Sequence, residues 1–391
     1  MIRKDPIPTG KRYNGNMSRL RLMTILGTRP EIIRLSEVIK CADRYFDHIL
    51  VHTGQNYDYT LNQVFFENLG LREPDHYLDS VGKDLGETMG NIIAKSYALM
   101  SEVRPDAVLI LGDTNSALSA ISAKRLKIPI FHMEAGNRCW DWNVSEMINR
   151  KIVDHISDIN LPYTEHSRRY LLSEGIDGKT IFVTGSPMKE VLIKNREQIE
   201  ASRVLDELSL KPKQFILVSA HREENIDIEE NFFALMESIN HMAEKYDMPV
   251  IYSTHPRSQK FIDARGFGFD SRVRNLKPFG YFDYNKLQEN AFCVLSDSGT
   301  LSEESAMMDF PAVLIRTSTE RPEVLDKGSV IIGGIRSEDV EQAVELAVSM
   351  YDNREPYVEA EDYADENVSV KVIKLIQSYT KIVNETVWLK H

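Results

Sequence analysis

Short apolar runs recur along the chain, and amphipathic stretches of helical periodicity lie between them. Ile32, Leu35 and Ile39, for example, return at the three-to-four-residue spacing of a helix that buries one face. Strands that alternate with helices predict parallel sheets built from right-handed βαβ units. The predicted strands are Leu22–Leu26, Ile49–His52, Ala107–Leu111, Ile128–His132, Ile181–Thr184, Phe215–Ser219, Val250–Ser253, Phe292–Leu295, Ala312–Ile315 and Val330–Ile332.

This pattern occurs twice, so we expect an α/β protein with two Rossmann-like domains whose parallel sheets face a central cleft. Ligands of such folds bind at the C-terminal ends of the strands. No strand is followed by a GxGxxG fingerprint, so a Rossmann-like fold here does not by itself indicate NAD binding. The expected division is a flexible N-terminal arm (1–16), a first domain (17–188), a second domain (189–367) and a final helix that packs back on the first domain (368–391).

Composition narrows the class of protein. The 391 residues, 42% of them hydrophobic and 27% charged, are typical of a globular protein with two sizeable cores. A net charge of −12 argues against a nucleic-acid partner. No run of about 18 apolar residues predicts a membrane span, and the first 16 residues lack the apolar core of a signal peptide. The three widely spaced cysteines suit a reducing cytoplasm.

The segment from Phe292 to Glu323 is the most informative part of the chain. An apolar strand breaks at Ser296-Asp297-Ser298-Gly299, and Thr300 then opens a helix. A Gly-containing turn at a helix N-terminus leaves backbone N–H groups free to bind an anion. The next strand leads into Arg316 and Arg321, whose guanidinium groups suit a nucleotide diphosphate. An ordinary strand–turn–helix remains the simpler interpretation of the turn alone.

The first strand ends in Gly27-Thr28-Arg29-Pro30-Glu31. Thr28 and Glu31 have the spacing of a capping box, and proline suits the first helical turn. Arg29 would then lie at a helix N-terminus, where it could hold a phosphate. A capped helix with a solvated arginine is the alternative.

Acidic residues and a histidine follow other strands. Asp113 and Glu134 each end a strand, and Glu146 follows shortly afterwards. Carboxylates gathered in a dry cleft have raised pKa values and can exchange protons, although each acid alone could simply cap a helix. His221 ends the first strand of the second half, where a lone histidine is more often structural, as we expect for His255. No metal-ligand cluster and no nucleophile elbow is present.

Taken in order, these motifs resemble the non-hydrolysing UDP-N-acetylglucosamine 2-epimerase family. The resemblance runs from about residue 23 to 334 and implies a glycosyltransferase-B-type (GT-B) fold that holds UDP in the cleft, mainly through the second domain. The motifs are GTRPE at Gly27, HTGQ at His52, GDT at Gly112, EAG at Glu134, NR at Asn149, HR at His221, DSG at Asp297 and TERPE at Thr319.

The resemblance also implies roles for individual residues. Arg29, Ser298, Gly299 and His221 would hold the diphosphate, with His221 also counted as catalytic; Glu304 would hold the ribose, and Arg321 would lie near the nucleotide. Asp113, Glu134 and Glu146 match the family's acid–base carboxylates, and Arg150 its substrate-binding arginine. The implied reaction removes the proton at C2 of the sugar while UDP leaves C1, then returns both. It needs no cofactor and no metal. The expected partners are a UDP-sugar and a second copy of the chain in a homodimer.

Departures from the family pattern bear on the sugar. Gln55-Asn56-Tyr57-Asp58-Tyr59 replaces a GQH segment and puts an allosteric sugar site in doubt, while Ser145-Glu146-Met147 replaces PEE. With the shorter loop from Asn137 to Val144, these features are similar to a subgroup that converts UDP-2-acetamido-2,6-dideoxy-L-talose to UDP-N-acetyl-L-fucosamine. Trp140 and Trp142 could form an apolar wall of the sugar site, or they could pack elsewhere in the protein.

Other functions are consistent with parts of this pattern. UDP-N-acetylglucosamine is the alternative substrate, and a hydrolysing epimerase would release free sugar and UDP. A GT-B glycosyltransferase would bind the same donor but has no need for three acids in the first domain. A non-catalytic nucleotide-sugar sensor could lose those acids, so their presence favours an enzyme.

Overall fold

The computed structural model describes residues 19–54, 63–140, 142, 144, 146–316, 321–355 and 360–390. The expected N-terminal arm, the segment from Gln55 to Tyr59, and Thr319 and Glu320 of the TERPE motif lie outside these residues.

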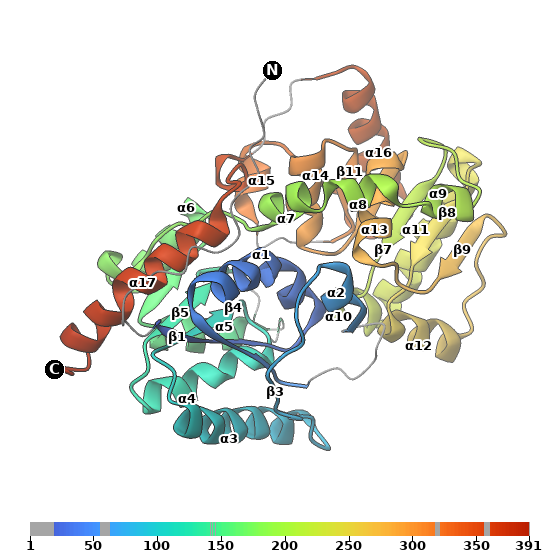
Figure 1. Ribbon diagram of the computed structural model, residues 1–391. Coiled ribbons are helices and arrows are strands. Elements are labelled where there is room, and N and C mark those ends of the chain that lie inside the picture. Colours follow the sequence, from blue (N-terminus) through green and yellow to red (C-terminus); the bar gives the residue numbers. More distant parts are fainter. Residues whose placement is uncertain are drawn as a thin grey trace.

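Two six-stranded parallel sheets form the framework, and their strand orders correspond. The first sheet runs β3-β2-β1-β4-β5-β6 and the second β12-β11-β10-β7-β8-β9, so each follows the doubly wound 3-2-1-4-5-6 order of a Rossmann fold. The expected α/β, GT-B-type architecture is therefore confirmed (Figure 1). The strands are β1 (Arg21–Leu26), β2 (Asp47–His52), β3 (His76–Tyr77), β4 (Ala107–Leu111), β5 (Ile130–Met133), β6 (Ile159–Leu161), β7 (Ile216–Ser219), β8 (Val250–Ser253), β9 (Val273–Leu276), β10 (Cys293–Ser296), β11 (Ala312–Leu314) and β12 (Ile331–Ile332).

Helices connect the strands and cover the sheets. The amphipathic stretch that contains Ile32, Leu35 and Ile39 forms a helix, and all three side chains are fully buried. The helices are α1 (Arg29–Tyr45), α2 (Gln63–Asn68), α3 (Leu85–Val103), α4 (Ser119–Arg125), α5 (Glu146–Ile156), α6 (Glu165–Ser173), α7 (Met188–Lys194), α8 (Arg196–Ala201), α9 (Val204–Glu207), α10 (Glu223–Ile226), α11 (Glu229–Tyr246), α12 (Pro256–Arg265), α13 (Tyr281–Asn290), α14 (Thr300–Met308), α15 (Pro322–Asp326), α16 (Ser337–Asp352) and α17 (Val368–Thr386).

One predicted strand is wrong. Ile181–Thr184 forms only an isolated bridge, between Ile181 and Asn160, although the Phe182 amide donates to the Asn160 carbonyl in β6 and the Thr184 amide to the Pro162 carbonyl directly after it. This segment lies along the edge of the sheet without joining its ladder. The sixth strand is instead β6, and β3 and β9 were also not predicted.

The two sheets are joined by helical segments. The chain passes from one to the other through α7, α8 and α9, and α17 later packs against α1. Apolar residues of α7 and α17, among them Val191 and Ile376, belong to the same core cluster as Leu35 of α1. The division at residues 188 and 367 remains our proposal. Within the described residues, no helix has the length and hydrophobicity needed to cross a membrane.

Candidate active site

A cavity lies between the two sheets, where strand ends of both halves meet. α1 and α2 contribute walls from the first half, and α13 and α14 contribute walls from the second. This is the edge at which doubly wound folds bind ligands. The lining residues include Arg29, Ile33, Arg34, Phe65, Ser219, His221, His255, Phe279, Tyr281, Tyr284, Ser298, Thr300 and Glu304.

The turn between β10 and α14 forms one side of this cavity. Gly299 is the N-cap of α14, and the hydroxyls of Ser298 and Thr300 lie 2.9 Å apart. The buried carboxylate of Asp297 accepts from the backbone N–H groups of His221 and Arg222, each at 2.9 Å to Oδ2. Asp297 therefore fixes the histidine loop against a helix start that can bind an anion.

His221 and His255 stack on each other at the cavity wall, with ring centroids 5.2 Å apart. Burial lowers the pKa of His221, although Asp297 opposes this effect. Burial, with His221 and Arg29 nearby, lowers the pKa of His255 to about 4. His255 caps α12 by accepting from the N–H of Arg257, as its expected structural role requires, and it also lines the cavity.

Arg29 begins α1 and faces the cavity, but the predicted capping box is wrong in detail. The Thr28 hydroxyl donates to Glu31 Oε2 at 2.7 Å instead of accepting from the helix, and the Gly27 N–H donates to the same oxygen at 3.1 Å. A Thr114 hydroxyl donates to the other oxygen at 3.2 Å. Burial raises the pKa of Glu31 to about 7 despite these donors. Glu31 therefore ties two site loops together.

Glu304 lies in the cavity, in the second turn of α14. Its Oε2 accepts from Gln288 Nε2 at 2.5 Å, and burial raises its pKa although the contacts with Gln288 and Thr300 lower it. Arg29, His221, Ser298 and Glu304 thus come together in one cavity, from four different elements.

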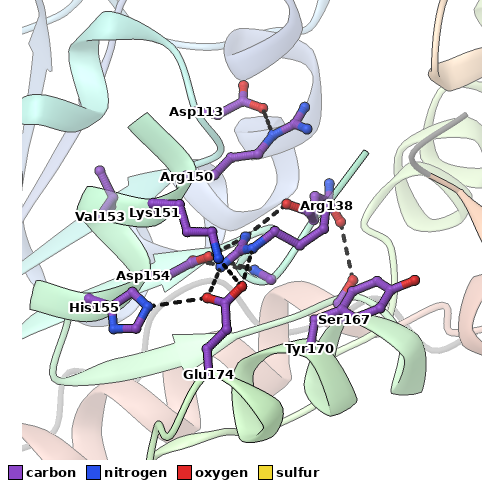
Figure 2. Close-up of polar contacts among 12 residues, drawn as sticks. Asp113, Arg138, Arg150, Lys151, Val153, Asp154, His155, Ser167, Tyr170 and Glu174 are labelled. Atoms are coloured by element: carbon purple, nitrogen blue, oxygen red, sulfur yellow. Dashed lines mark hydrogen bonds and ion pairs between the residues drawn. The ribbon is translucent and has the colours of Figure 1, made fainter. Parts of the chain in front are cut away.

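Asp113 follows β4 and pairs with Arg150 of α5, as Figure 2 shows. Arg150 Nε lies 2.6 Å from Asp113 Oδ2, and Asn149 Nδ2 donates to the Asp113 carbonyl at 2.9 Å. Burial raises the pKa of Asp113, and neighbouring Glu134 and Glu146 add to this effect against Arg150. Glu134 and Glu146 are therefore close enough to act on the charge of Asp113.

Glu134 follows β5 in an uncommon backbone conformation, with φ of +60°. A non-glycine residue in this region is strained, and such strain gathers at functional sites. Its Oε2 lies 3.5 Å from the point where a side chain on Gly112 would begin, beside Asp113. This is an ordinary van der Waals distance, so glycine is favoured at 112 by its φ of +69° and not by crowding.

A buried network holds Glu134 across the two halves of the chain. Arg34 of the first half and Arg321 of the second both form ion pairs with its carboxylate. Both arginines also bind Glu303 of α14, at 3.2 and 2.7 Å. Burial raises the pKa of Glu134, but the two arginines outweigh burial and lower it. Arg321, expected near the nucleotide, is therefore engaged with two carboxylates.

The remaining predicted residues lie near this network or beyond it. Glu146 is exposed at the first position of α5. The Trp140 ring is more than half exposed and packs on Tyr170, 5.6 Å between centroids, and Trp142 is likewise exposed. Among the residues described, no group of three or more His, Cys, Asp or Glu could hold a metal ion.

Sequence reasoning missed several residues of the site. Glu303 is a fully buried acid directly before Glu304, and only the fold reveals that it contacts arginines of both halves. The aromatic wall of Phe279, Tyr281 and Tyr284 follows β9, a strand that was not predicted. Asp297 belongs to the DSG motif named above, and its position at the end of a strand was the signal that could have indicated its role in the site.

Comparison with known proteins identifies relatives of the chain. The family model described as UDP-N-acetylglucosamine 2-epimerase matches residues 40–377. The UDP-N-acetylglucosamine 2-epimerase of Methanocaldococcus jannaschii is 34% identical over 84% of this chain and 93% of the relative. A UDP-2,3-diacetamido-2,3-dideoxy-D-glucuronate 2-epimerase of Pseudomonas aeruginosa is 32% identical over 83% of this chain and 91% of its own.

A solved structure, that of UDP-N-acetylglucosamine 2-epimerase from Rickettsia bellii, has 46% sequence identity and a TM-score of 0.88, covering 95% of this chain and 100% of that one. The M. jannaschii UDP-GlcNAc 2-epimerase in complex with UDP-GlcNAc and UDP has 31% identity and a TM-score of 0.85, covering 92% and 100%. These matches confirm the predicted isomerase-type enzyme, but not the 6-deoxy-sugar subgroup. On the evidence of its fold, its motifs and these relatives, the chain belongs to the UDP-N-acetylglucosamine 2-epimerase family.

Proposed function

We propose that the protein inverts C2 of a UDP-2-acetamido sugar by proton abstraction, with elimination and return of UDP. The observation that carries this proposal is a pair of neighbouring carboxylates, Asp113 and Glu134, whose pKa values are shifted in opposite directions. Groups whose environments separate their pKa values are suited to act as acid and base. They lie in the same interdomain region as the turn suited to bind a diphosphate.

The C2 proton of such a sugar is only weakly acidic, so loss of UDP from C1 must assist its removal. In our proposal Arg29, His221, Ser298 and Gly299 bind the diphosphate and stabilise its charge as it departs. Glu304 binds the ribose. Arg321 lies near the nucleotide.

Glu134, held ionised by Arg34 and Arg321, is suited to accept the C2 proton. Asp113, whose raised pKa favours the protonated form, is suited to deliver a proton to C2 from its own side of the sugar. In this proposal Arg150 orients Asp113, and Glu146 exchanges protons with solvent. Both carboxylates are only partly exposed, so bound substrate would need to cover little more surface to exclude the water that would otherwise consume the unsaturated sugar intermediate.

For the sugar itself, we propose UDP-2-acetamido-2,6-dideoxy-L-talose, which would give UDP-N-acetyl-L-fucosamine for capsule or O-antigen synthesis. The departures at Ser145 to Met147 and in the loop after Asn137 support this substrate. The Trp140 ring adds no support, because it packs on Tyr170 and neither residue lines the cavity described above.

UDP-N-acetylglucosamine is the second candidate, and it is favoured because the R. bellii and M. jannaschii relatives are named as UDP-N-acetylglucosamine 2-epimerases. Comparison of kcat/KM for the two UDP-sugars decides between them. A buried hydroxyl without a partner costs about 1–3 kcal/mol, so a site made for the 6-methyl group should prefer the L-talo sugar by roughly tenfold to a hundredfold. Higher efficiency with UDP-N-acetylglucosamine would reject the L-sugar. We also expect a homodimer, which the mass in solution will test.

A further inference from the structure

One face of α5 lies directly behind the two acids. Glu146, Arg150 and Asp154 are four residues apart and so project from the same side of this helix. Arg150 binds the Asp113 side chain, as described above. Asp154 is 1% exposed, and its carboxylate has no part in the proposed reaction.

Asp154 holds the turn that carries Glu134. The Gly136 N–H donates to both of its oxygens at 3.2 Å, and Arg138 Nη1 lies 2.8 Å from Oδ2. The same Arg138 nitrogen donates to the Asn137 carbonyl at 2.8 Å, and Asn137 Nδ2 donates to Glu134 Oε1 at 3.1 Å. A continuous set of contacts therefore links Asp154 to the Glu134 carboxylate.

Asp154 also reaches the turn that carries Asp113, through His132 of β5. His132 Nδ1 lies 3.0 Å from Asp154 Oδ1, and its Nε2 lies 2.8 Å from the carbonyl oxygen of Gly112. The Asp154 carboxylate and the Gly112 carbonyl oxygen are both acceptors, so their positions favour the imidazolium form of His132. Gly112 has φ of +69°, and its carbonyl orientation sets the direction of Asp113.

The charges around His132 favour this state. Burial lowers the pKa of His132, but Asp154, the Gly112 carbonyl and Asp113 outweigh burial and raise it. Arg138 contacts Asp154 from the other side. Arg138 is fully buried and also binds Glu174, through Nε and Nη2 at 2.8 and 2.7 Å; Figure 2 shows it between the two acids.

We propose that Asp154 is a positioning residue that, through protonated His132 and through Gly136 and Arg138, holds the turns of Asp113 and Glu134 in their relative orientation. The activity test of this inference rests on the proposed function. A displacement of about 1 Å in such an arrangement can lower the rate about a hundredfold, even when substrate binding is unchanged.

Two substitutions of His132 separate its two contacts. His132→Gln retains an amide donor near the Nε2 position for the Gly112 carbonyl, whereas His132→Asn retains one near Nδ1 for Asp154. We expect both variants to lower kcat by about tenfold to a hundredfold, with KM changed less than about twofold, because each breaks one of the two contacts through which Asp154 reaches the Asp113 turn. Asp154→Asn should lower kcat at least as much as His132→Gln, which loses the same contact, and combining these two substitutions should be little worse than Asp154→Asn alone.

His48 provides a matched control on the same sheet. It too is buried with both ring nitrogens engaged, 2.6 Å from Asp43 Oδ1 and 2.8 Å from Thr24 Oγ1, but it lies near the start of β2, away from the strand ends that form the site. His48→Gln should lower the melting temperature without lowering kcat. The proposal would be overturned if the His132 variants lost no more of kcat than His48→Gln does. A change in KM alone, with kcat kept, would also overturn it.

The protonation state of His132 gives a measurement independent of activity. In ¹⁵N-histidine NMR of the full chain, we expect His132 to titrate above 6.5 in the wild type and below it in Asp154→Asn. A neutral His132 at pH 6 in the wild type would overturn the proposal even if the variants do not fold. Failure of the wild type to epimerise either UDP-sugar would instead reject the proposed function and leave this NMR result standing.

Discussion

Arg321 Nη2 lies 2.8 Å from Glu134 Oε1, and this contact joins the second half of the chain to an acid of the first. Both side chains are largely withdrawn from solvent, so removal of one partner would leave the other as a costly unpaired charge. Arg321 belongs to the segment we expect near the nucleotide. The charge of Glu134, a candidate base, is therefore coupled to Arg321, a residue that we expect near the nucleotide.

Glu134→Gln should lower kcat by about two to four orders of magnitude, the usual contribution of an acid–base residue. Affinity for UDP should stay the same or rise, because Arg321 loses a competing carboxylate. Asp113→Asn and Glu146→Gln should lower kcat on the same scale. Steady-state kinetics and calorimetry with UDP measure the two effects. Glu165→Gln, at an exposed glutamate of the same half, is the control. Full activity of the three acid variants would refute their assignment.

Arg29→Ala should weaken UDP binding by about tenfold to a hundredfold, because a charge-assisted hydrogen bond contributes about 1.5–3 kcal/mol. Glu304→Gln should also weaken it, through the ribose. Calorimetry measures the dissociation constant, and Arg44→Ala, in the last turn of the same helix, is the control for Arg29. UDP affinity that is unchanged in both variants would place the nucleotide elsewhere.

Glu31→Gln should change how stability depends on pH. Burial raises the folded pKa of Glu31 to about 7 from its ordinary value of 4.5, so its contribution to stability is fully present below pH 4.5 and is lost as pH rises through 7. Relative to the glutamine variant, the wild type should lose up to about 3 kcal/mol between pH 4 and 8. Urea unfolding across this range measures the difference. A difference that does not vary with pH would contradict the prediction.

Glu174→Gln should have the opposite pH dependence. Burial raises the pKa of Glu174, but Arg138, Lys151 and His155 outweigh burial and bring it to about 2. Its contribution is present above the ordinary pKa of 4.5 and lost as pH falls toward 2. At pH 7 the variant should be less stable by about 1 kcal/mol, because solvent screens this carboxylate and Arg138 keeps its contact with Asp154. We expect this gap, measured by urea unfolding, to shrink below pH 4.

Much of the fold could be predicted because its long strands are continuous apolar runs that end in distinctive turns. β1, β4 and β7 were located to within one residue. β3 and β6 have two and three residues, too few to show a period, and β9 carries the exposed Arg274. Ile181 has the apolar character of a strand but sits beyond the edge of the ladder.

The candidate site was predictable only where a side chain directly follows a strand. His221 and Ser298 meet because the C-terminal ends of neighbouring parallel strands share an edge, and Arg29 joins them because the strand ends of the first sheet face the same cavity. Arg34 and Glu303 are 269 residues apart, and no local pattern indicates that they pair. The same holds for Asp154 and His132, whose contact depends on how α5 packs on the sheet.

The central claim is abstraction of the proton at C2, and the most direct test is turnover in heavy water followed by NMR of the sugar. We expect deuterium at C2 of the inverted UDP-sugar, at a rate that falls with kcat in Glu134→Gln, and with no nicotinamide added. Inversion of C2 with the original proton fully retained would contradict the account.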